Sequence, residues 1–306
     1  MTTFTRRRLL QVGAASVAAL AVGKPLAAHA LGPILGTVVD YAAGVPNAGA
    51  IKAAGHLGSV RYVSERRPGA ESWMLGKPVT LAETRAQSGA GLKIASVYQF
   101  GRAETADWLQ GAAGADRHAP EAIRIHRAAG GPNNRPIYVA IDDNPTWNQY
   151  ANQIRPYLQR FKQRLESAGL ILGIYGNYNV IDWAIKDGLG SFFWQHDWGS
   201  NGKIHPRTTI HQKAGYKATI AGVEVDVNNV YAQDWGQWTP GQVASSPAAP
   251  AAAAPVPAAP SIPNLPLPGM PAGSSLPTIP GGAGSSLPSI SDKQIQAAVN
   301  LANRFL

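Results

Sequence analysis

Cysteine is absent from all 306 residues of this chain. Its absence excludes disulfide bonds, thiolate catalysis, zinc sites with cysteine ligands and anchoring through a lipidated cysteine. The fold must therefore depend on a packed core, for which the 45% of hydrophobic residues are sufficient.

Charged residues are also scarce, at 15% of the chain, and part of the net charge of +9 comes from one end. The first thirty residues hold four basic side chains and no acid, which leaves 23 basic and 18 acidic residues, a net charge of +5, in the rest. We find no basic stripe and no nucleic-acid-binding motif, so we expect no nucleic-acid partner. The mild positive charge suits an anionic cell envelope.

Several motifs with a known chemistry are missing. The chain has no Gly-x-Ser-x-Gly elbow and no glycine loop that could cradle a phosphate. His196 and His211 are more typical of core or loop positions than of ligands, and no His/Asp spacing indicates a metal site. We therefore expect neither a metal nor another cofactor.

The first thirty residues have the features of an export signal. Arg6 and Arg7 precede a mildly apolar run, and Ala28-His29-Ala30 places small residues where a signal peptidase reads. The pattern resembles a twin-arginine signal cleaved after Ala30, with an ordinary secretory signal or an uncleaved anchor as alternatives. We expect export to the periplasm, the cell wall or the medium, and no transmembrane helix in the mature chain.

The other end of the chain is predicted to be a tether. Residues 240–290 contain 13 of the 24 prolines and no charged residue, so we expect a disordered Pro/Ala/Ser/Gly-rich linker over 239–290. Residues 291–306 then have one thin apolar stripe at helical spacing, which predicts a short C-terminal helix. Such a helix could dock to the barrel, a partner or a membrane surface, and a frayed terminus is the alternative.

The intervening residues 31–238 contain eight short apolar runs that are typical of strands. Most of the segments between these runs predict helices, the clearest over 146–169 and a helix pair within 103–130. Eight strands that alternate with helices over roughly 200 residues predict an α/β fold, a (β/α)8 TIM-like barrel. The connection over 197–207 is too short and too polar for a helix, so we expect irregularity around the sixth and seventh strands. The eight runs are 36–41, 59–64, 93–99, 136–142, 170–177, 191–195, 208–212 and 223–230.

The ends of these runs are rich in acids, amides and aromatic residues. Barrel enzymes carry their chemistry at the carboxyl ends of the strands, and alternation along a strand decides which side chains point inward. Asp142 shares a face with Tyr138 and Ala140, while Glu224 and Asp226 alternate with valines. We predict Asp40, Asp142, Glu224 and Asp226 as catalytic carboxyls, and expect the substrate-binding residues to be Gln99, Tyr175, Asn177, Trp194, Gln195, Gln212 and Asn228.

Simpler explanations exist for most of these residues. Asp40 could cap a helix, and Glu224 and Asp226 could form a structural hydrogen-bond network. Asp143, in Asp-Asn-Pro, is more typical of a turn than of a catalyst. Trp194 could be a packing residue.

Four segments together resemble the actinobacterial exported glycoside hydrolase-like domain, a family similar in fold to the family 25 muramidases. The resemblance spans roughly residues 34–238. It implies inward acids on the first, fourth and last strands, which Asp40, Asp142 and Asp226 match. The segments are 36–41 (GTVVDY), 139–143 (VAIDD), 172–176 (LGIYG) and 225–228 (VDVN).

The chain departs from the muramidase pattern at one position. The muramidase fourth strand ends Asp-x-Glu, with the glutamate as general acid, and this chain has Asn144 there. A neutral amide cannot donate that proton, so Asp142, Asp143 or Glu224 must supply it, or the barrel does not hydrolyse by this route. The sequence supports two hypotheses: an exported O-glycosyl hydrolase acting on cell-wall polysaccharide (peptidoglycan or arabinogalactan), or an inactive glycan-binding scaffold of the envelope.

Overall fold

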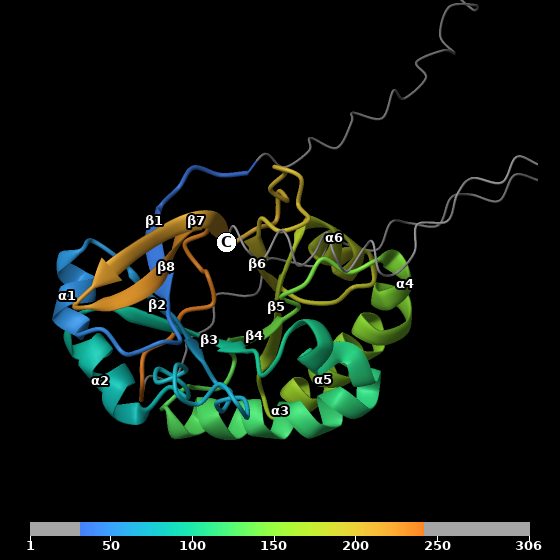
Figure 1. The fold of residues 1–306 in the computed structure, drawn as a ribbon, viewed down its shortest axis with the longest axis horizontal. Coiled ribbons are helices and arrows are strands. Elements are labelled where there is room, and N and C mark those ends of the chain that lie inside the picture. The colour runs from blue at the N-terminus through green and yellow to red at the C-terminus, as the bar shows by residue number, and fades with distance from the viewer. Residues whose placement is uncertain (1–30, 242–306) are drawn as a thin grey trace, which may run out of the picture. The chain divides into compact units, whose positions relative to one another are not determined.

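A closed barrel of eight strands forms the centre of the computed structural model, which describes residues 31–241 (Figure 1). The predicted export signal, the linker after residue 241 and the C-terminal helix lie outside the described residues. The strands are β1 Gly36–Asp40, β2 Gly58–Tyr62, β3 Lys93–Tyr98, β4 Pro136–Ala140, β5 Ile171–Gly176, β6 Phe192–His196, β7 Ile210–Ile220 and β8 Val223–Val230. The α-helices are α1 Ala48–Ala53, α2 Leu81–Gly89, α3 Gly111–Ala128, α4 Trp147–Gln149, α5 Arg155–Ser167 and α6 Tyr178–Lys186.

All eight predicted strands are present, and their ends agree within two residues except at the end of β7. β7 continues to Ile220 and forms a long antiparallel hairpin with β8. Ala221 and Gly222, which join the two strands, both have positive φ, as a tight two-residue hairpin turn requires. The outer half of β7 is exposed, because the hairpin extends beyond the part of the barrel that other elements cover.

The predicted (β/α)8 TIM-like barrel is wrong. The barrel is mixed: β1 to β7 pair in parallel, whereas β8 is antiparallel to both β7 and β1. Within residues 31–241, α-helices follow only the first five strands, and β6, β7 and β8 are joined without one. The helix-free connection over 197–207 was expected, but β8 could not be oriented from its sequence, because an apolar alternation is the same in either direction.

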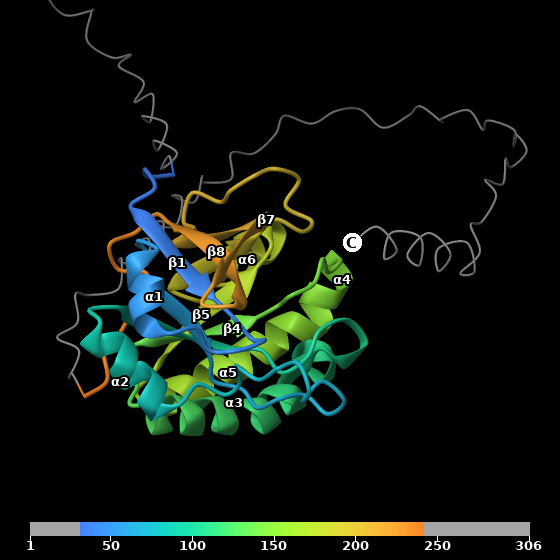
Figure 2. The same cartoon turned by 60° about the vertical axis from the view of Figure 1, so that its left-hand side comes forward.

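Two helical predictions have different outcomes. Residues 147–167 are helical throughout, as α4, a π-helical turn over Tyr150–Ile154 and α5. The predicted helix pair within 103–130 is instead one long helix, α3, preceded by two short 3₁₀ turns. α3 and α5 pack against each other along one side of the barrel (Figure 2). Among the helices of the described range, none is both long and apolar enough to cross a membrane.

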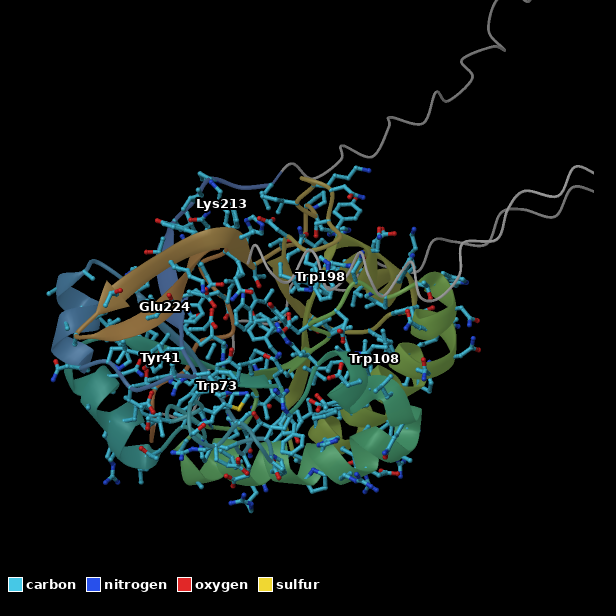
Figure 3. The ribbon with its side chains drawn as sticks, in the orientation of Figure 1. Tyr41, Trp73, Trp108, Trp198, Lys213 and Glu224 are labelled. Atoms are coloured by element: carbon cyan, nitrogen blue, oxygen red, sulfur yellow. The ribbon has the colours of Figure 1, made fainter. Side chains whose placement is uncertain are left out.

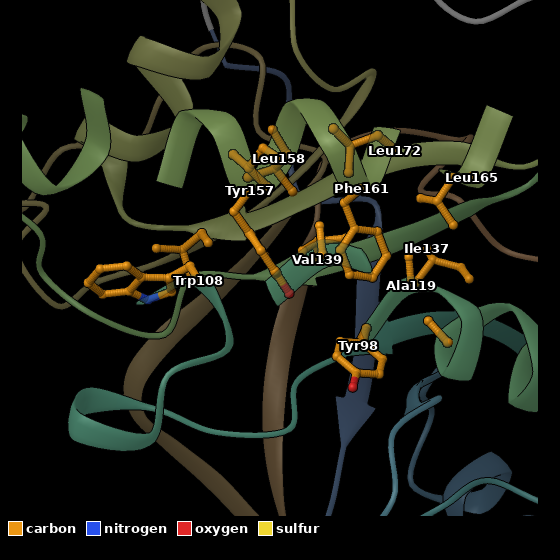
Figure 4. Close-up of a cluster of buried hydrophobic side chains, with 14 of the residues drawn as sticks. Tyr98, Trp108, Ala119, Ile137, Val139, Tyr157, Leu158, Phe161, Leu165 and Leu172 are labelled. Atoms are coloured by element: carbon orange, nitrogen blue, oxygen red, sulfur yellow. The ribbon is translucent and has the colours of Figure 1, made fainter. Parts of the chain in front are cut away.

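Alternate side chains of the strands enter two separate cores. Ile137, Val139 and Ile141 pack outward in a cluster with α3 and α5, where Phe161 and Tyr157 are fully buried (Figure 4). Tyr138 and Ala140 belong to a second cluster inside the barrel. The predicted alternation of β4 is therefore confirmed, and Asp142 continues the inward series at the mouth of the barrel.

A buried ion pair connects this mouth to the helices. Arg61 on β2 is fully buried, and its Nε donates to Oε1 of Glu83 on α2 over 2.5 Å. The same guanidinium donates to the carbonyls of Tyr41 and Gly76, each at 2.6 Å. Arg61 therefore joins the end of β1 to the loop that follows β2, and both segments border the site described below.

Replacing Arg61 with Met should destabilise the fold by about 3–5 kcal/mol, because it leaves the buried Glu83 carboxylate without its cation. Urea unfolding monitored by circular dichroism would measure the loss. Arg85→Met, an exposed change on α2, is the control and should cost less than about 0.5 kcal/mol. A loss below about 1 kcal/mol for Arg61→Met would show that the pair does not support the fold.

Candidate functional site

A cleft of about 400 Å³ opens at the carboxyl ends of the first parallel strands. Its walls come from the ends of β1 and β3, the loop over 63–80, Asp142 just beyond β4, and the β7–β8 hairpin. All four predicted catalytic carboxyls, Asp40, Asp142, Glu224 and Asp226, line this cleft, as does Gln99. Figure 3 shows Glu224, on the hairpin, and Trp73, from the loop over 63–80, which also line it.

Asp40 and Asp226 form a cross-strand pair in the cleft. They are directly opposite each other in the antiparallel register of β1 and β8. Side chains at such positions project from the same face, with Cβ atoms about 5 Å apart. Nε2 of Gln212 lies 3.1 Å from Oδ2 of Asp40 and 3.4 Å from Oδ2 of Asp226, so these two oxygens are at most 6.5 Å apart.

Three donors hold the Asp40 carboxyl. Nδ2 of Asn228 donates to Oδ2 over 2.8 Å, Gln212 donates to the same oxygen, and the Tyr62 hydroxyl donates to Oδ1 over 3.2 Å. Only 2% of Asp40 is exposed, so these contacts replace most of its water. Oδ1 of Asn228 in turn accepts from the indole of Trp194 over 2.9 Å, which fixes the orientation of the amide.

Burial and the neighbouring charge of Asp226 raise the pKa of Asp40 from its ordinary 3.8 to about 7, although its three hydrogen bonds partly offset this effect. Burial also raises the pKa of Asp226, while the Lys217 ammonium opposes the increase. The two acids interact strongly, so they titrate as a pair. The pair holds a proton in the neutral range, which is what a general acid requires.

Asp142 is the third inward acid, and its surroundings differ. It is half-buried, accepts from Nε2 of Gln99 over 2.8 Å and lies 3.4 Å from the hydroxyl of Tyr175. The same hydroxyl donates to Oε1 of Gln212 over 2.5 Å. The single hydroxyl proton of Tyr175 is thus used on Gln212, which donates to both members of the pair, and Asp142 lies beside this network.

Glu224 lies at the rim rather than inside. Its side chain is 65% exposed and accepts from Nζ of Lys217 over 2.8 Å. Its burial was expected because the last strand of a TIM-like barrel is covered by helices, but here β8 belongs to the projecting hairpin. Glu224 is therefore a solvated, ion-paired carboxyl at the edge of the cleft.

Six of the seven predicted substrate-binding residues do not line the cleft, and only Gln99 does. Tyr175, Gln212 and Asn228 belong to the hydrogen-bond network around the carboxyls, whereas the other three have structural roles. Asn177 caps α6, with Oδ1 accepting from the backbone N–H of Val180. Trp194 is 2% exposed inside the barrel, where its ring lies 4.4 Å from that of Tyr175. Gln195 is fully buried, and its amide holds the connection between β6 and β7. Alternation identifies the face of a strand but not the depth of a residue in the barrel, so it could not separate these residues from Gln99, which lines the cleft.

The two residues after Asp142 point elsewhere. The carboxylate of Asp143 accepts from the indole of Trp108 over 2.8 Å and from the backbone N–H of Ala103 over 3.0 Å. It therefore organises the loop before α3, a long-range role rather than one within its own turn. Oδ1 of Asn144 accepts from Nδ2 of Asn177 over 3.0 Å, and neither Asp143 nor Asn144 lines the cleft.

Sequence patterns did not predict the lining residues of the loop over 63–80, among them Trp73 and Lys77. Trp73 is 50% exposed in the cleft, although it follows no strand and belongs to no periodic pattern. Lys77 is 4% exposed, with Nζ 2.8 Å from the carbonyl of Gln99 and 4.0 Å from the ring centre of Tyr62. Burial lowers the pKa of Lys77 to about 8. Within residues 31–241, no group of three His or acidic side chains is arranged to hold a metal ion.

Asp40→Asn should stabilise the protein more at pH 8 than at pH 4.5. The pKa of Asp40 is about 7 in the folded state and ordinary in the unfolded chain, so its contribution to stability is complete below about pH 4 and is lost as the pH rises through 7. Asparagine carries no charge and can still accept from Asn228 and Gln212. We expect its advantage over the wild type to grow by roughly 2 kcal/mol or more between the two pH values.

Urea midpoints of both proteins at the two pH values would measure this change. Glu71→Gln removes an exposed acid outside the cleft lining and is the matched control, whose difference from the wild type should not depend on pH. An equally flat profile for Asp40→Asn would contradict a raised pKa.

The chain is similar to known proteins in sequence and in structure. The sequence profile of the Rv2525c-like, glycoside hydrolase-like domain matches residues 49–230. A Mycobacterium tuberculosis protein, Rv2525c, provisionally named a peptidoglycan hydrolase, is 49% identical over 239 residues, which cover 76% of this chain and 98% of that protein. Two crystal structures of this Tat-secreted protein each align with this chain at 52% identity and a TM-score of 0.63, over 67% of this chain. The alignment covers 100% of the crystallised chain in the complex with L-tartrate and 99% in the complex with HEPES. The chain described here therefore belongs to the Rv2525c-like family of glycoside hydrolase-like domains.

Proposed function

We propose that this protein is an exported glycan hydrolase of the cell wall, with its reaction centre at Asp40, Asp226 and Asp142. The observation that carries the proposal is the register of β1 and β8, which opposes two acids in a cleft and gives them one shared donor, Gln212. Two like charges at this position are unfavourable for stability, so a structural role alone does not explain them.

The three acids suit different steps of glycosidic cleavage. The Asp40–Asp226 pair holds a proton near neutral pH and can donate it to the leaving oxygen, most directly through Asp226, which is the less buried of the two. Asp142, held by Gln99 and adjacent to the Tyr175 hydroxyl, provides the second carboxylate, as nucleophile or as base toward water. The rim position of Glu224 supports removing it from the predicted catalytic set.

The chemistry of the cleft also favours a sugar. Amides and hydroxyls hold the carboxylates, and the exposed ring of Trp73 provides an apolar surface on which the C–H face of a sugar can stack. Export by the twin-arginine route is supported by Arg6 and Arg7 and by the secretion of Rv2525c by that route. The provisional name of Rv2525c supports cell-wall glycan as the target.

Asn144 favours a second candidate, a protein that binds wall glycan without cleaving it. In this candidate the cleft is retained, but the position of the muramidase general acid holds a neutral side chain that is turned toward Asn177. The two candidates differ in turnover and agree in binding.

Release of reducing ends from purified cell-wall glycan should fall by about 10²-fold or more in Asp142→Asn and in Asp226→Asn, since each variant loses a carboxyl that takes part in the reaction. Glu224→Gln is the matched control and should keep at least half of the activity, because this carboxylate is at the rim. A wild type that binds glycan but releases no more ends than Asp142→Asn would support the binding protein instead. Equal losses in all three variants would contradict the assigned roles.

Trp73→Ala should weaken binding of glycan oligomers by about tenfold, a typical cost for a lost aromatic contact. Isothermal titration of oligomers prepared from the wall would measure the change. Trp198→Ala is the matched control, since Trp198 is 57% exposed but does not line the cleft, and its affinity should equal that of the wild type. Weaker binding in Trp198→Ala than in Trp73→Ala would place the binding surface elsewhere.

A further inference from the structure

One wall of the cleft has a charge that the proposed reaction does not use. Four cations line the cleft: Arg67, Lys77, Arg102 and Lys217. Lys217 is ion-paired with Glu224. The other three form no ion pair within 4.0 Å with any acid among residues 31–241.

Two of these cations, Arg67 and Arg102, lie in loops that contact each other. Nη1 of Arg67, after β2, lies 3.4 Å from the hydroxyl of Thr105, and that hydroxyl also accepts from the backbone N–H of Arg102 over 3.2 Å. The contact of Arg67 is long, and the guanidinium of Arg102 has no observed partner in the described part of the chain. Both guanidinium groups therefore keep most of their donors.

Two neighbouring arginines, Arg66 and Arg61, are engaged differently. Arg66, one residue earlier, donates to the carbonyls of Lys77 and Leu75 and so braces its own loop. Arg61 uses its guanidinium on Glu83 and two carbonyls. Arg61 and Arg66 thus have structural partners, whereas Arg67 and Arg102 line the cleft with most of their donors unpaired within residues 31–241.

Lys77 provides independent evidence, because its side chain is buried. Its ammonium has three N–H donors; it donates to the carbonyl of Gln99 and lies 4.0 Å from the centre of the Tyr62 ring, and the residue is 4% exposed. Burial lowers its pKa, and the charges of Arg61 and Arg67 act in the same direction. A buried ammonium with donors to spare needs an acceptor, and it lines the same cleft as the two arginines.

The position of this wall relates it to the reaction centre. Gln99 contacts Lys77 through its carbonyl and Asp142 through its amide, so one residue separates the cationic wall from the reacting carboxylates. An anion bound there would belong to the sugar beside the bond that is cleaved. Guanidinium groups bind carboxylate and phosphate with two parallel hydrogen bonds, a geometry that neutral hydroxyls do not provide.

We propose that Arg67, Arg102 and Lys77 form an anion subsite, and that the substrate is a glycan whose sugar carries a carboxylate or phosphate substituent. The inference rests on the proposed function and narrows it, because it excludes neutral wall polysaccharides as the preferred ligand. It concerns binding, so it can hold even if the protein does not cleave.

Three sugars that share the same ring provide the test. They are N-acetylglucosamine, its 6-phosphate, and N-acetylmuramic acid, which adds a carboxylate to that ring. Each is titrated into the ¹⁵N-labelled full-length chain while the indole signal of Trp73, assigned with Trp73→Phe, is followed. We expect at least one acidic sugar to bind about tenfold more tightly than the neutral one, and the more effective substituent identifies the natural anion.

The preference for the acidic sugar should disappear in the double variant Arg67→Gln/Arg102→Gln. It should survive in the double variant Arg67→Lys/Arg102→Lys, which keeps both charges. Arg85→Gln/Arg164→Gln removes the same charge from α2 and α5, away from the cleft, and should behave as the wild type. No saturable shift with either acid, equal affinity for all three sugars, or a preference that persists in the glutamine double variant would overturn the subsite. Preferred binding of an acidic sugar without release of reducing ends would instead overturn only the proposed hydrolysis.

Discussion

The antiparallel pairing of β8 with β1 is the constraint on which the site depends. It closes the barrel, and its register places Asp226 directly opposite Asp40. A parallel eighth strand would meet β1 with a different alternation of hydrogen bonds and would need a crossover helix to enter the barrel. The hairpin turn at Ala221 and Gly222 removes that need, and the hairpin provides one wall of the cleft.

The free-energy cost of burying the Asp40 carboxyl is offset by a series of hydrogen bonds among polar side chains. Trp194 orients Asn228, Asn228 and Gln212 donate to Asp40, and Tyr175 donates to Gln212. Several of these residues lack access to solvent and serve the cleft by orienting its carboxyls. The Arg61–Glu83 pair has a similar role in the walls, since it fixes the end of β1 and the loop that carries Trp73. Burial thus raises the pKa of Asp40, while the network limits that increase.

Local sequence patterns predicted the strands and the inward acids well. Alternation along β4 identified the face of Asp142 because Ile137, Val139 and Ile141 need a helix-covered core. The direction of β8 and the exposure of Glu224 could not be predicted in this way, because both depend on which strand β8 pairs with. Alternation also does not indicate how deep a residue lies in the barrel, so Trp194 and Gln195 could not be separated from lining residues.

The loop over 63–80 was the least predictable part of the site. Trp73 and Lys77 enter the cleft through long-range contacts, such as that between Arg61 and the carbonyl of Gly76, and no periodic pattern marks them. Function in this cleft therefore combines strand-end acids that alternation can identify with loop residues that only the tertiary structure brings near. The cationic character of one wall belongs to this second group.

The most direct test of the account is the titration of Asp40 itself, followed by the carboxyl ¹³C signal of labelled aspartate and assigned with Asp40→Asn. The account predicts an apparent pKa of about 7 for Asp40, with a smaller coupled shift in the signal of Asp226 over the same pH range. A single ordinary titration of Asp40 near pH 4, independent of Asp226, would contradict the claim that the β1–β8 register creates a proton-holding pair.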